Sequence, residues 1–369
     1  MGYALVTPGT SLGLPDDAAH LTTRQISAAP TCHAAFMPML ILRYDLRLPP
    51  EGTTPTSVTG AGQYAAMLEQ CRWGDRVGAD MIVVSEHHGA PDSFMSAPLT
   101  IAAGILGATS RVNVNVSALL AIMHNPIRLA EELAAIDLMF PGRLSVILGT
   151  GYRQEEFDML GITFKERNEL LESCVNAIRQ AWTGEYFEYE GRRVRVTPTP
   201  GTPGGPMMML GGSSEQAARR AARLRCIFTS AIGTPALGEA YYDECAKVGF
   251  QGYASLPHGA GFIHVSMDPE RDWERIAPYA FHEARTYASW QRKGQSSSVT
   301  VKNAETIDDL KASGVYQVLT PDEFVEQWHA GSPFGGMVLH PLMGGIPPEL
   351  AWESLELVEH DVMGRIKPV

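Results

Sequence analysis

From Met39 onward, short apolar runs alternate with stretches in which apolar residues recur every three or four positions. The short runs are typical of buried parallel strands, and the longer stretches are typical of amphipathic helices. The stretch 171–182 shows the helical spacing most clearly. The strands predicted in this way are Met39–Tyr44, Met81–Val84, Val112–Leu120, Leu144–Leu148, Met207–Leu210, Cys226–Thr229, Ile263–Val265 and Met337–His340.

These runs make eight strand-then-helix units, which predict an α/β fold, a (β/α)8 TIM barrel, because repeated βα units build a parallel sheet that closes at eight strands. Two segments interrupt the rhythm and predict insertions after strand four and before strand eight. The first is Glu185–Pro206, rich in Gly, Pro and Arg, and the second is the polar, helical segment Asp268–His329. No GxGxxG follows the first predicted strand, which argues against a Rossmann fold.

The length of 369 residues fits one such barrel with its insertions. Residues 37–369 are predicted to form this single domain, and residues 1–36, which lack a clear period, are predicted to form a weakly ordered N-terminal extension. The formal net charge is −12. A chain with this charge is a poor binder of nucleic acid or of anionic membranes, because both require a basic surface.

Five scattered cysteines without a CxxC pair indicate neither a disulfide framework nor a zinc knuckle. We therefore expect a reduced, cytoplasmic setting. No run approaches the roughly 18 apolar residues that a membrane span needs.

Polar and glycine-rich segments follow several of the predicted strands. Ser85–His88 follows strand two, Gly149–Arg153 follows strand four, and Gly211–Ser214 follows strand five and precedes a helix. In a barrel the carboxyl ends of the strands form the functional face. The two glycine segments let an anion approach backbone N–H groups, so we expect them to hold a phosphate, with Arg153 near enough to add charge.

The triplet Glu86-His87-His88 could suggest a metal site, but adjacent residues on a strand face opposite ways and no H-x-H is present. We expect no metal. A single histidine at a strand mouth is better suited to carry a proton or to orient a bound ring, and His87 is our candidate. We expect His88 to be a satisfied polar residue.

Taken in order, these segments resemble the bacterial luciferase-like flavin monooxygenases, which are (β/α)8-barrel oxidoreductases. The resemblance spans about residues 39–369, and the chained motifs are more specific than any one alone. The matching motifs are Ser85–His88, Ala108–Arg111, His124–Glu132, Asp137–Arg143, Gly149–Arg153 with Glu155–Phe157 and Gly161, and Gly211–Ser213.

The resemblance implies a monooxygenase that uses reduced FMN and dioxygen on a small organic substrate, through a C4a-peroxyflavin. It implies that His87 is the catalytic histidine that assists formation or breakdown of this peroxide. The cofactor-binding residues it implies are Ser117, Thr150, Gly151, Tyr152, Arg153, Gly212 and Ser213. It further implies a homodimer and a separate NAD(P)H-flavin reductase as partners.

Two departures from luciferase stand out. Luciferase carries an arginine and a reactive cysteine where this chain has Thr150 and Gly149, so light emission is not expected.

Two alternatives to the monooxygenase stay open. One is hydride transfer with the deazaflavin coenzyme F-420 on the same fold, and the other is flavin binding without turnover. The candidate mouth-facing residues suggest an uncharged organic substrate, and they are Tyr44, Phe94, Met95 and Met123.

Overall fold

The computed structural model describes residues 38–53, 58–230, 232–256, 260–291, 301–331 and 336–367. The predicted extension, residues 1–36, lies outside the described residues. Among the helices that are described, none is both long enough and apolar enough to cross a bilayer.

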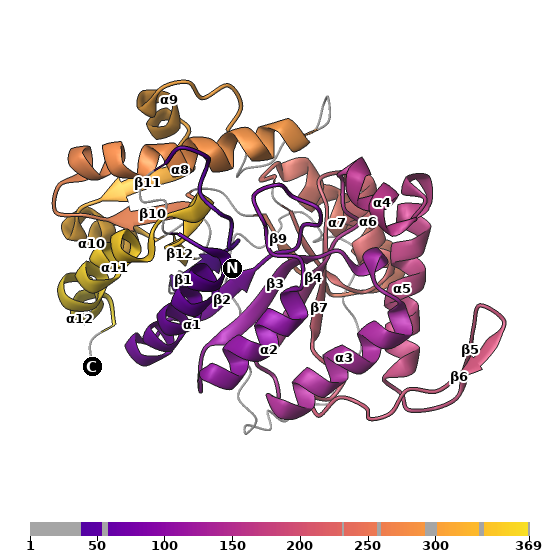
Figure 1. The fold of residues 1–369 in the computed structure, drawn as a ribbon. Helices are drawn as coiled ribbons and strands as arrows, with labels where there is room; N and C mark the ends of the chain where they lie inside the picture. Colours follow the sequence, from indigo (N-terminus) through magenta and orange to yellow (C-terminus); the bar gives the residue numbers. More distant parts are fainter. Residues whose placement is uncertain are drawn as a thin grey trace, which may run out of the picture.

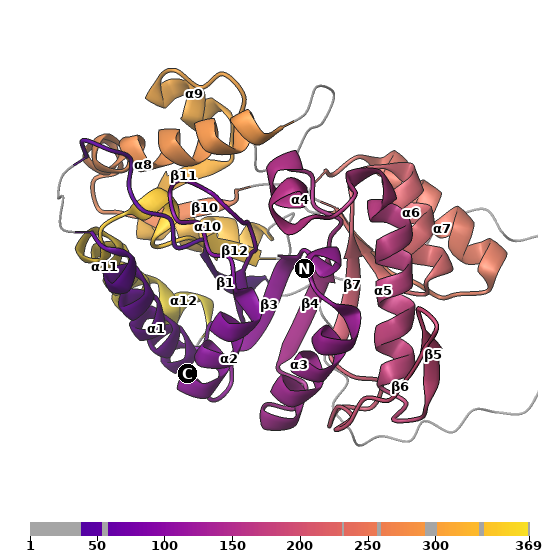
Figure 2. The same ribbon diagram turned by 45° about the vertical axis from the view of Figure 1, so that its right-hand side comes forward.

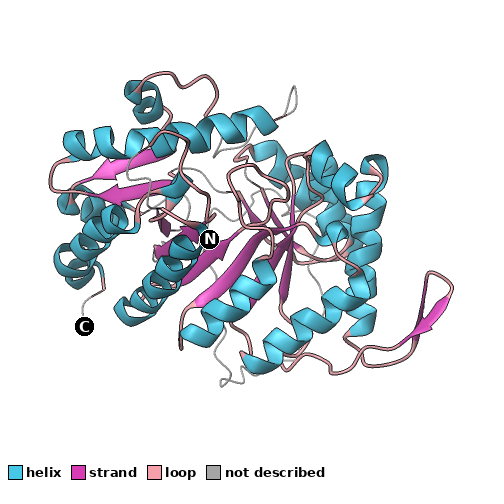
Figure 3. Ribbon diagram, viewed as in Figure 1, coloured by secondary structure: helices cyan, strands magenta, loops and turns pink. Residues whose placement is uncertain are grey.

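The core of the molecule is one parallel sheet with helices around it (Figures 1 and 3). Its order is β11-β10-β12-β1-β2-β3-β4-β7-β8-β9, and every pair is parallel. Within the described residues no pairing joins β9 to β11, the two ends of this order. The strands are β1 (Met39–Tyr44), β2 (Met81–Val84), β3 (Asn113–Leu119), β4 (Leu144–Leu148), β7 (Met207–Gly211), β8 (Ile227–Thr229), β9 (Ala254–Ser255), β10 (Phe262–Val265), β11 (Tyr316–Leu319) and β12 (Gly336–Leu339).

All eight predicted strands are present within one residue of the predicted bounds, and the (β/α)8 fold class is confirmed. Some of the helices that follow them begin at side chains that cap free N–H groups. Thr59 caps the first helix, and Asn125 caps the third by accepting from the N–H groups of Ile127 and Arg128. The helices are α1 (Gly60–Val77), α2 (Pro98–Ala108), α3 (Pro126–Met139), α4 (Gln154–Leu160), α5 (Arg167–Ala181), α6 (Glu215–Arg223), α7 (Pro235–Val248), α8 (Pro269–Trp290), α9 (Ile307–Ala312), α10 (Pro321–Ala330), α11 (Pro348–Leu357) and α12 (Met363–Ile366).

Both predicted insertions are present. The first contains the antiparallel hairpin of β5 (Phe187–Tyr189) and β6 (Arg192–Val194), which stands at the periphery, away from α8 and α9 (Figures 1 and 2). The second contains α8, α9 and α10, but also β11, which pairs with β10. The polar sequence around these four residues concealed this strand. Neither β11 nor the two-residue β9 was predicted.

Helix α8 crosses the end of the sheet at which β1 and β12 finish (Figure 1). The hydroxyl of Tyr287 on α8 accepts a hydrogen bond of 3.2 Å from Arg43 Nη2 in β1. Glu283, one turn earlier, lies 3.7 Å from His340, the residue after β12. The second insertion therefore places side chains over the face where the sequence predicts the functional site.

Candidate functional site

His87 follows β2 and is the centre of a buried polar group. Its Nδ1 atom lies 2.8 Å from Oε1 of Glu156, and its side chain is only 9% exposed. Glu156 lies on α4, a short helix after β4 that ends at Gly161 with a positive φ of 71°. The segment after β2 and the helix after β4 thus supply the two members of this pair, and β3 lies between these two strands in the sheet.

Glu156 Oε1 receives two further donors. The backbone N–H of His88 donates at 3.0 Å, and Arg153 Nη1 donates at 3.3 Å. A carboxylate only accepts hydrogen bonds, so His87 donates from Nδ1, and its Nε2 atom carries the lone pair that can accept a hydrogen bond. That Nε2 atom lies 3.4 Å from the hydroxyl of Tyr152.

The pKa of His87 is lowered from its ordinary value, chiefly because burial disfavours the imidazolium form. Glu156 acts in the opposite direction, whereas the positive charges of Arg47 and Arg153 add to the lowering. His87 is therefore a neutral imidazole at neutral pH, with its acceptor atom toward Tyr152.

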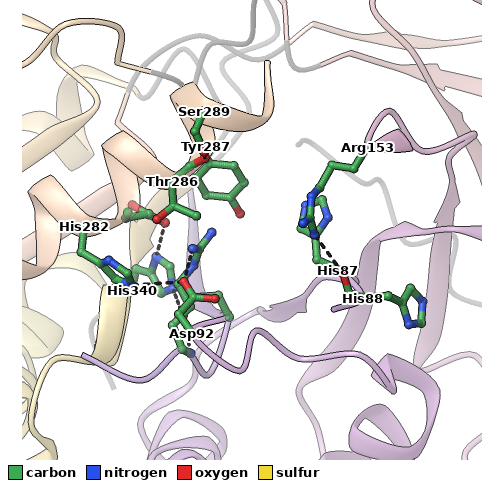
Figure 4. A network of polar contacts seen from close by, with 12 residues as sticks. His87, His88, Asp92, Arg153, His282, Thr286, Tyr287, Ser289 and His340 are labelled. Atoms are coloured by element: carbon green, nitrogen blue, oxygen red, sulfur yellow. Dashed lines mark hydrogen bonds and ion pairs between the residues drawn. The ribbon is translucent and has the colours of Figure 1, made fainter. Parts of the chain in front are cut away.

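Glu86 forms a separate cluster with His88 and His124. Both Nε2 atoms lie 2.9 Å from Glu86 Oε1, and the N–H of Leu120 donates to Oε2 at 2.6 Å. Burial alone would raise the pKa of Glu86, but hydrogen bonds from His124 and His88 lower it to about 2. His87 and His88 thus contact different carboxylates, and their rings lie apart in Figure 4. His88 has the satisfied role expected of it.

Aromatic rings surround the imidazole of His87. Its ring centroid lies 4.8 Å from Phe94, 5.6 Å from Tyr152, 6.2 Å from Tyr287 and 4.7 Å from Trp290. We call Phe94, Tyr152, Tyr287 and Trp290 the aromatic cluster. Tyr287 and Trp290 come from α8, so the second insertion covers His87.

Two guanidinium groups complete this cluster. Arg47, after β1, pairs with Asp45 at 3.0 Å and with Asp92 at 2.5 Å, and its Cζ lies 5.0 Å from the Trp290 centroid. Arg153 Cζ lies 4.1 Å from the same centroid. In Figure 4 Tyr287 extends toward the side on which His87 and Arg153 lie.

Behind Arg47 lies another buried group, Asp45, Glu283 and His340, whose possible ligand atoms are within 4.8 Å of one another. His340 Nε2 is 3.6 Å from Asp45 and its Nδ1 is 3.7 Å from Glu283. A metal ion would bind one ring nitrogen, whereas these carboxylates face opposite nitrogens. Arg43 and Arg47 also contact the carboxylates, so we describe a charge-balanced network and assign no metal to it.

The two loops predicted to hold a phosphate are neighbours, because β4 and β7 pair from Ser145↔Met207 to Leu148↔Leu210. Thr150 and Gly151 are half-buried after β4, and Ser213 is exposed directly before α6, whose N-cap is Ser214. Ser117 lies in β3, beside β4. Arg153, in contrast, donates to the His88 carbonyl at 2.9 Å and so faces the His87 side.

Gly212 has a structural reason to be glycine. Its N–H donates to the carbonyl of Thr229 at 3.2 Å, and a Cβ at this position would lie 2.4 Å from that of Ala217 in α6. Its lack of a side chain therefore lets α6 pack against the end of β7. Any anion at this loop would meet the hydroxyl of Ser213 and the free N–H groups of the first turn of α6.

Sequence reasoning found His87 and Phe94 but missed Arg47, Tyr287 and Trp290, and it used Glu156 only as part of a motif. The charged segment after β1 was a signal for Arg47, because a buried strand rarely ends in charges without partners. Trp290 gave no signal, because its contact with His87 depends on the path of a long insertion.

The chain is similar in sequence to known proteins. A sequence model of the family described as luciferase-like monooxygenase matches residues 48–333. The beta chain of alkanal monooxygenase from Photorhabdus luminescens is 25% identical over 162 residues, which cover 42% of this chain and 50% of that protein. An uncharacterised protein of Sinorhizobium fredii is 27% identical over 132 residues, 36% of this chain and 38% of that one. The match thus spans half or less of these relatives.

Solved structures share the fold over most of the chain. A monooxygenase from Streptomyces bottropensis has a TM-score of 0.68 at 18% identity, covering 88% of this chain and 99% of that one. The oxygenating constituent of 3,6-diketocamphane monooxygenase from Pseudomonas putida, in complex with FMN, has a TM-score of 0.67 at 18% identity, covering 89% and 98%. A secondary alcohol dehydrogenase dependent on coenzyme F-420 has a TM-score of 0.62 at 16% identity, covering 90% and 100%.

Proposed function

We propose that this chain, which belongs to the luciferase-like monooxygenase family, is a flavin-dependent monooxygenase that uses reduced FMN and dioxygen to oxidise a small organic substrate. The observation that carries the proposal is the buried pair of His87 and Glu156 at the carboxyl ends of the strands. The pair lies against the aromatic cluster, and Glu156 is on the helix that follows the loop after β4. Such a site joins an anion-binding edge to a hydrophobic, largely water-free interior.

The residues present fit a flavin by the chemistry of their donors. Thr150 and Ser213 would hold the phosphate, together with the positive end of α6. Gly212, whose N–H is donated to Thr229, would let α6 lie close to it. Ser117, Gly151, Tyr152 and Arg153 would lie along the remainder of the cofactor. When bound, reduced flavin supplies the electrons that activate dioxygen.

The protein's own contribution is to exclude water and to place a proton acceptor. Glu156 fixes the orientation of the His87 ring through Nδ1, so that Nε2 is the atom that takes or returns a proton at the reacting centre. The lowered pKa of His87 keeps that atom unprotonated at neutral pH. The hydroxyl of Tyr152, 3.4 Å from Nε2, would relay this proton. A separate NAD(P)H-flavin reductase and a second copy of this chain are the partners that belong to this proposal.

A binding titration tests the choice of cofactor. We expect FMN to bind, and Ser213→Asp to weaken it by about tenfold because the new carboxylate repels the phosphate. Riboflavin, which has no phosphate, is the control and should bind both proteins equally. If coenzyme F-420 binds and FMN does not, hydride transfer replaces oxygenation as the function. Equal loss of riboflavin and FMN would remove the phosphate assignment.

A further inference from the structure

The indole of Trp290 occupies the space directly against His87. Its centroid is 4.7 Å from the imidazole, 4.1 Å from Arg153 Cζ and 5.0 Å from Arg47 Cζ. With this ring in place the side chain of His87 is 9% exposed. The imidazole is therefore almost closed off from a reacting molecule while this packing stays in place.

Trp290 is the member of the aromatic cluster best placed to move. Phe94 and Tyr287 are 4% and 7% exposed, and Tyr287 is further held by Arg43. Trp290 is half-buried and is the last residue of α8, where a helix has no following turn to hold it. A ligand that enters can therefore replace the indole while the other three rings stay in position.

The groups around the indole indicate the chemistry of a ligand that would take its place. Its neighbours are aromatic rings and two guanidinium groups, which favour a flat ring with an electron-rich face. The carboxylate partners of these arginines engage Nε and Nη1 of Arg47 and Nη1 of Arg153. Arg47 Nη2 and Arg153 Nε are buried without a hydrogen-bond partner. These two buried N–H donors would be satisfied by acceptor oxygens on the ligand.

The position of this space separates it from the loops proposed to hold the phosphate. Trp290, Tyr287, Arg47 and Phe94 come from α8 and from the segments after β1 and β2, whereas those loops follow β4 and β7. Arg153, at the end of the loop after β4, borders both regions. We propose that the space held by Trp290 binds the organic substrate, a planar aromatic molecule that carries acceptor oxygens such as a carboxylate. This inference rests on the proposed function and replaces the uncharged substrate expected from the sequence with a defined class.

Calorimetric titration of the flavin-free protein with three probes tests the chemistry. We expect 2-naphthoate to bind about tenfold more tightly than decanoate, which has the oxygens without the ring, or 2-naphthylmethylammonium, which has the ring with the opposite charge. Unpartnered oxygens of Asp92 and Glu156 also lie in this region, so the ammonium probe is the direct counter-test. Equal binding of either comparison probe would overturn the assignment.

The variant Trp290→Ala tests the role of the indole. Because the indole would compete with the ligand, its removal should strengthen naphthoate binding severalfold. Trp182→Ala is the matched control, a half-buried tryptophan at the end of α5, and it should leave the affinity unchanged. Weaker or unchanged naphthoate binding by Trp290→Ala, with an unaltered melting temperature, would show that the indole lines the binding site and does not occupy it. That result would contradict the inference.

Saturation with FMN separates substrate from cofactor. If the space belongs to the substrate, naphthoate binds equally well to the FMN-loaded protein. If FMN displaces naphthoate, the space belongs to the flavin ring and the inference is wrong. Naphthoate binding to a protein that fails to bind FMN would leave this inference standing while the proposed function falls.

Discussion

The Nδ1 atom of His87 lies 2.8 Å from Oε1 of Glu156, although 69 residues separate them in the chain. The same oxygen accepts from the N–H of His88 and from Arg153. This arrangement fixes one tautomer of His87 and aims Nε2 toward Tyr152. In the proposed function, the pair would act as an oriented proton acceptor.

Glu156→Gln should shift the acidic limb of the pH–activity profile to lower pH. The negative charge of Glu156 raises the pKa of His87 against the effect of burial, so its removal lowers that pKa further. His87 must be neutral to accept a proton, and it then stays neutral to lower pH. We expect turnover to fall about tenfold as orientation is lost. Glu155→Gln, an exposed neighbour, should change neither quantity, and an unmoved acidic limb in Glu156→Gln would contradict the pairing.

His87→Gln should reduce turnover by about 10²- to 10⁴-fold, because it removes the proton acceptor at the reacting centre. His88→Gln is the matched control. Its backbone N–H still donates to Glu156, and its imidazole contacts Glu86 instead of the site. We expect His88→Gln to affect thermal stability more than turnover. Turnover should be measured with reduced FMN supplied in excess, and similar losses in both variants would argue against a catalytic role for His87.

Glu86 should contribute to stability only above acidic pH. Its pKa is about 2 in the folded protein against an ordinary value of 4.5. The contribution is therefore complete above about pH 4.5 and is lost as the pH falls from 4.5 toward 2, with a size of about 3 kcal/mol. In urea unfolding, Glu86→Gln should be less stable than the parent above about pH 4.5, and this difference should shrink as the pH falls toward 2. Glu326→Gln, on the exposed side of α10, should unfold as the parent does. Equal pH dependence of stability in the parent and Glu86→Gln would refute the role.

Gly212→Ala should destabilise the fold by about 1–3 kcal/mol, because the new Cβ would lie 2.4 Å from that of Ala217. Ala217→Gly removes the clashing atom. The double variant should therefore be more stable than the sum of the two single changes predicts. Additive effects in thermal unfolding would mean that the glycine is required for another reason, such as close approach of a ligand.

The periodicity of the chain was sufficient to predict the eight strands of the barrel, but it did not predict strand β11 in the second insertion. Each predicted strand is a short apolar run flanked by turn residues, and such runs have few other places to be buried. β11 was missed because four residues inside a polar segment carry no period of their own, and pairing with β10 decides their conformation.

The site was predictable where it depends on the ends of strands, and unpredictable where it depends on insertions. His87 directly follows β2, so the barrel rule places it at the mouth. The contact of Glu156 with His87 depends on how α4 turns back, and the contact of Trp290 depends on the path of α8. The glycine at position 212 was predicted for its closeness to an anion, whereas packing against Ala217 already accounts for it.

The reaction of protein-bound reduced FMN with dioxygen, followed by flavin absorbance after rapid mixing, tests the proposed function most directly. We predict that reoxidation of the bound flavin proceeds in more than one phase and that its last phase is slower than that of free reduced FMN. We further predict that His87→Gln alters the rates of these phases. Reoxidation in a single phase at the rate of free flavin, with and without aromatic carboxylates present, would contradict a monooxygenase function for this chain.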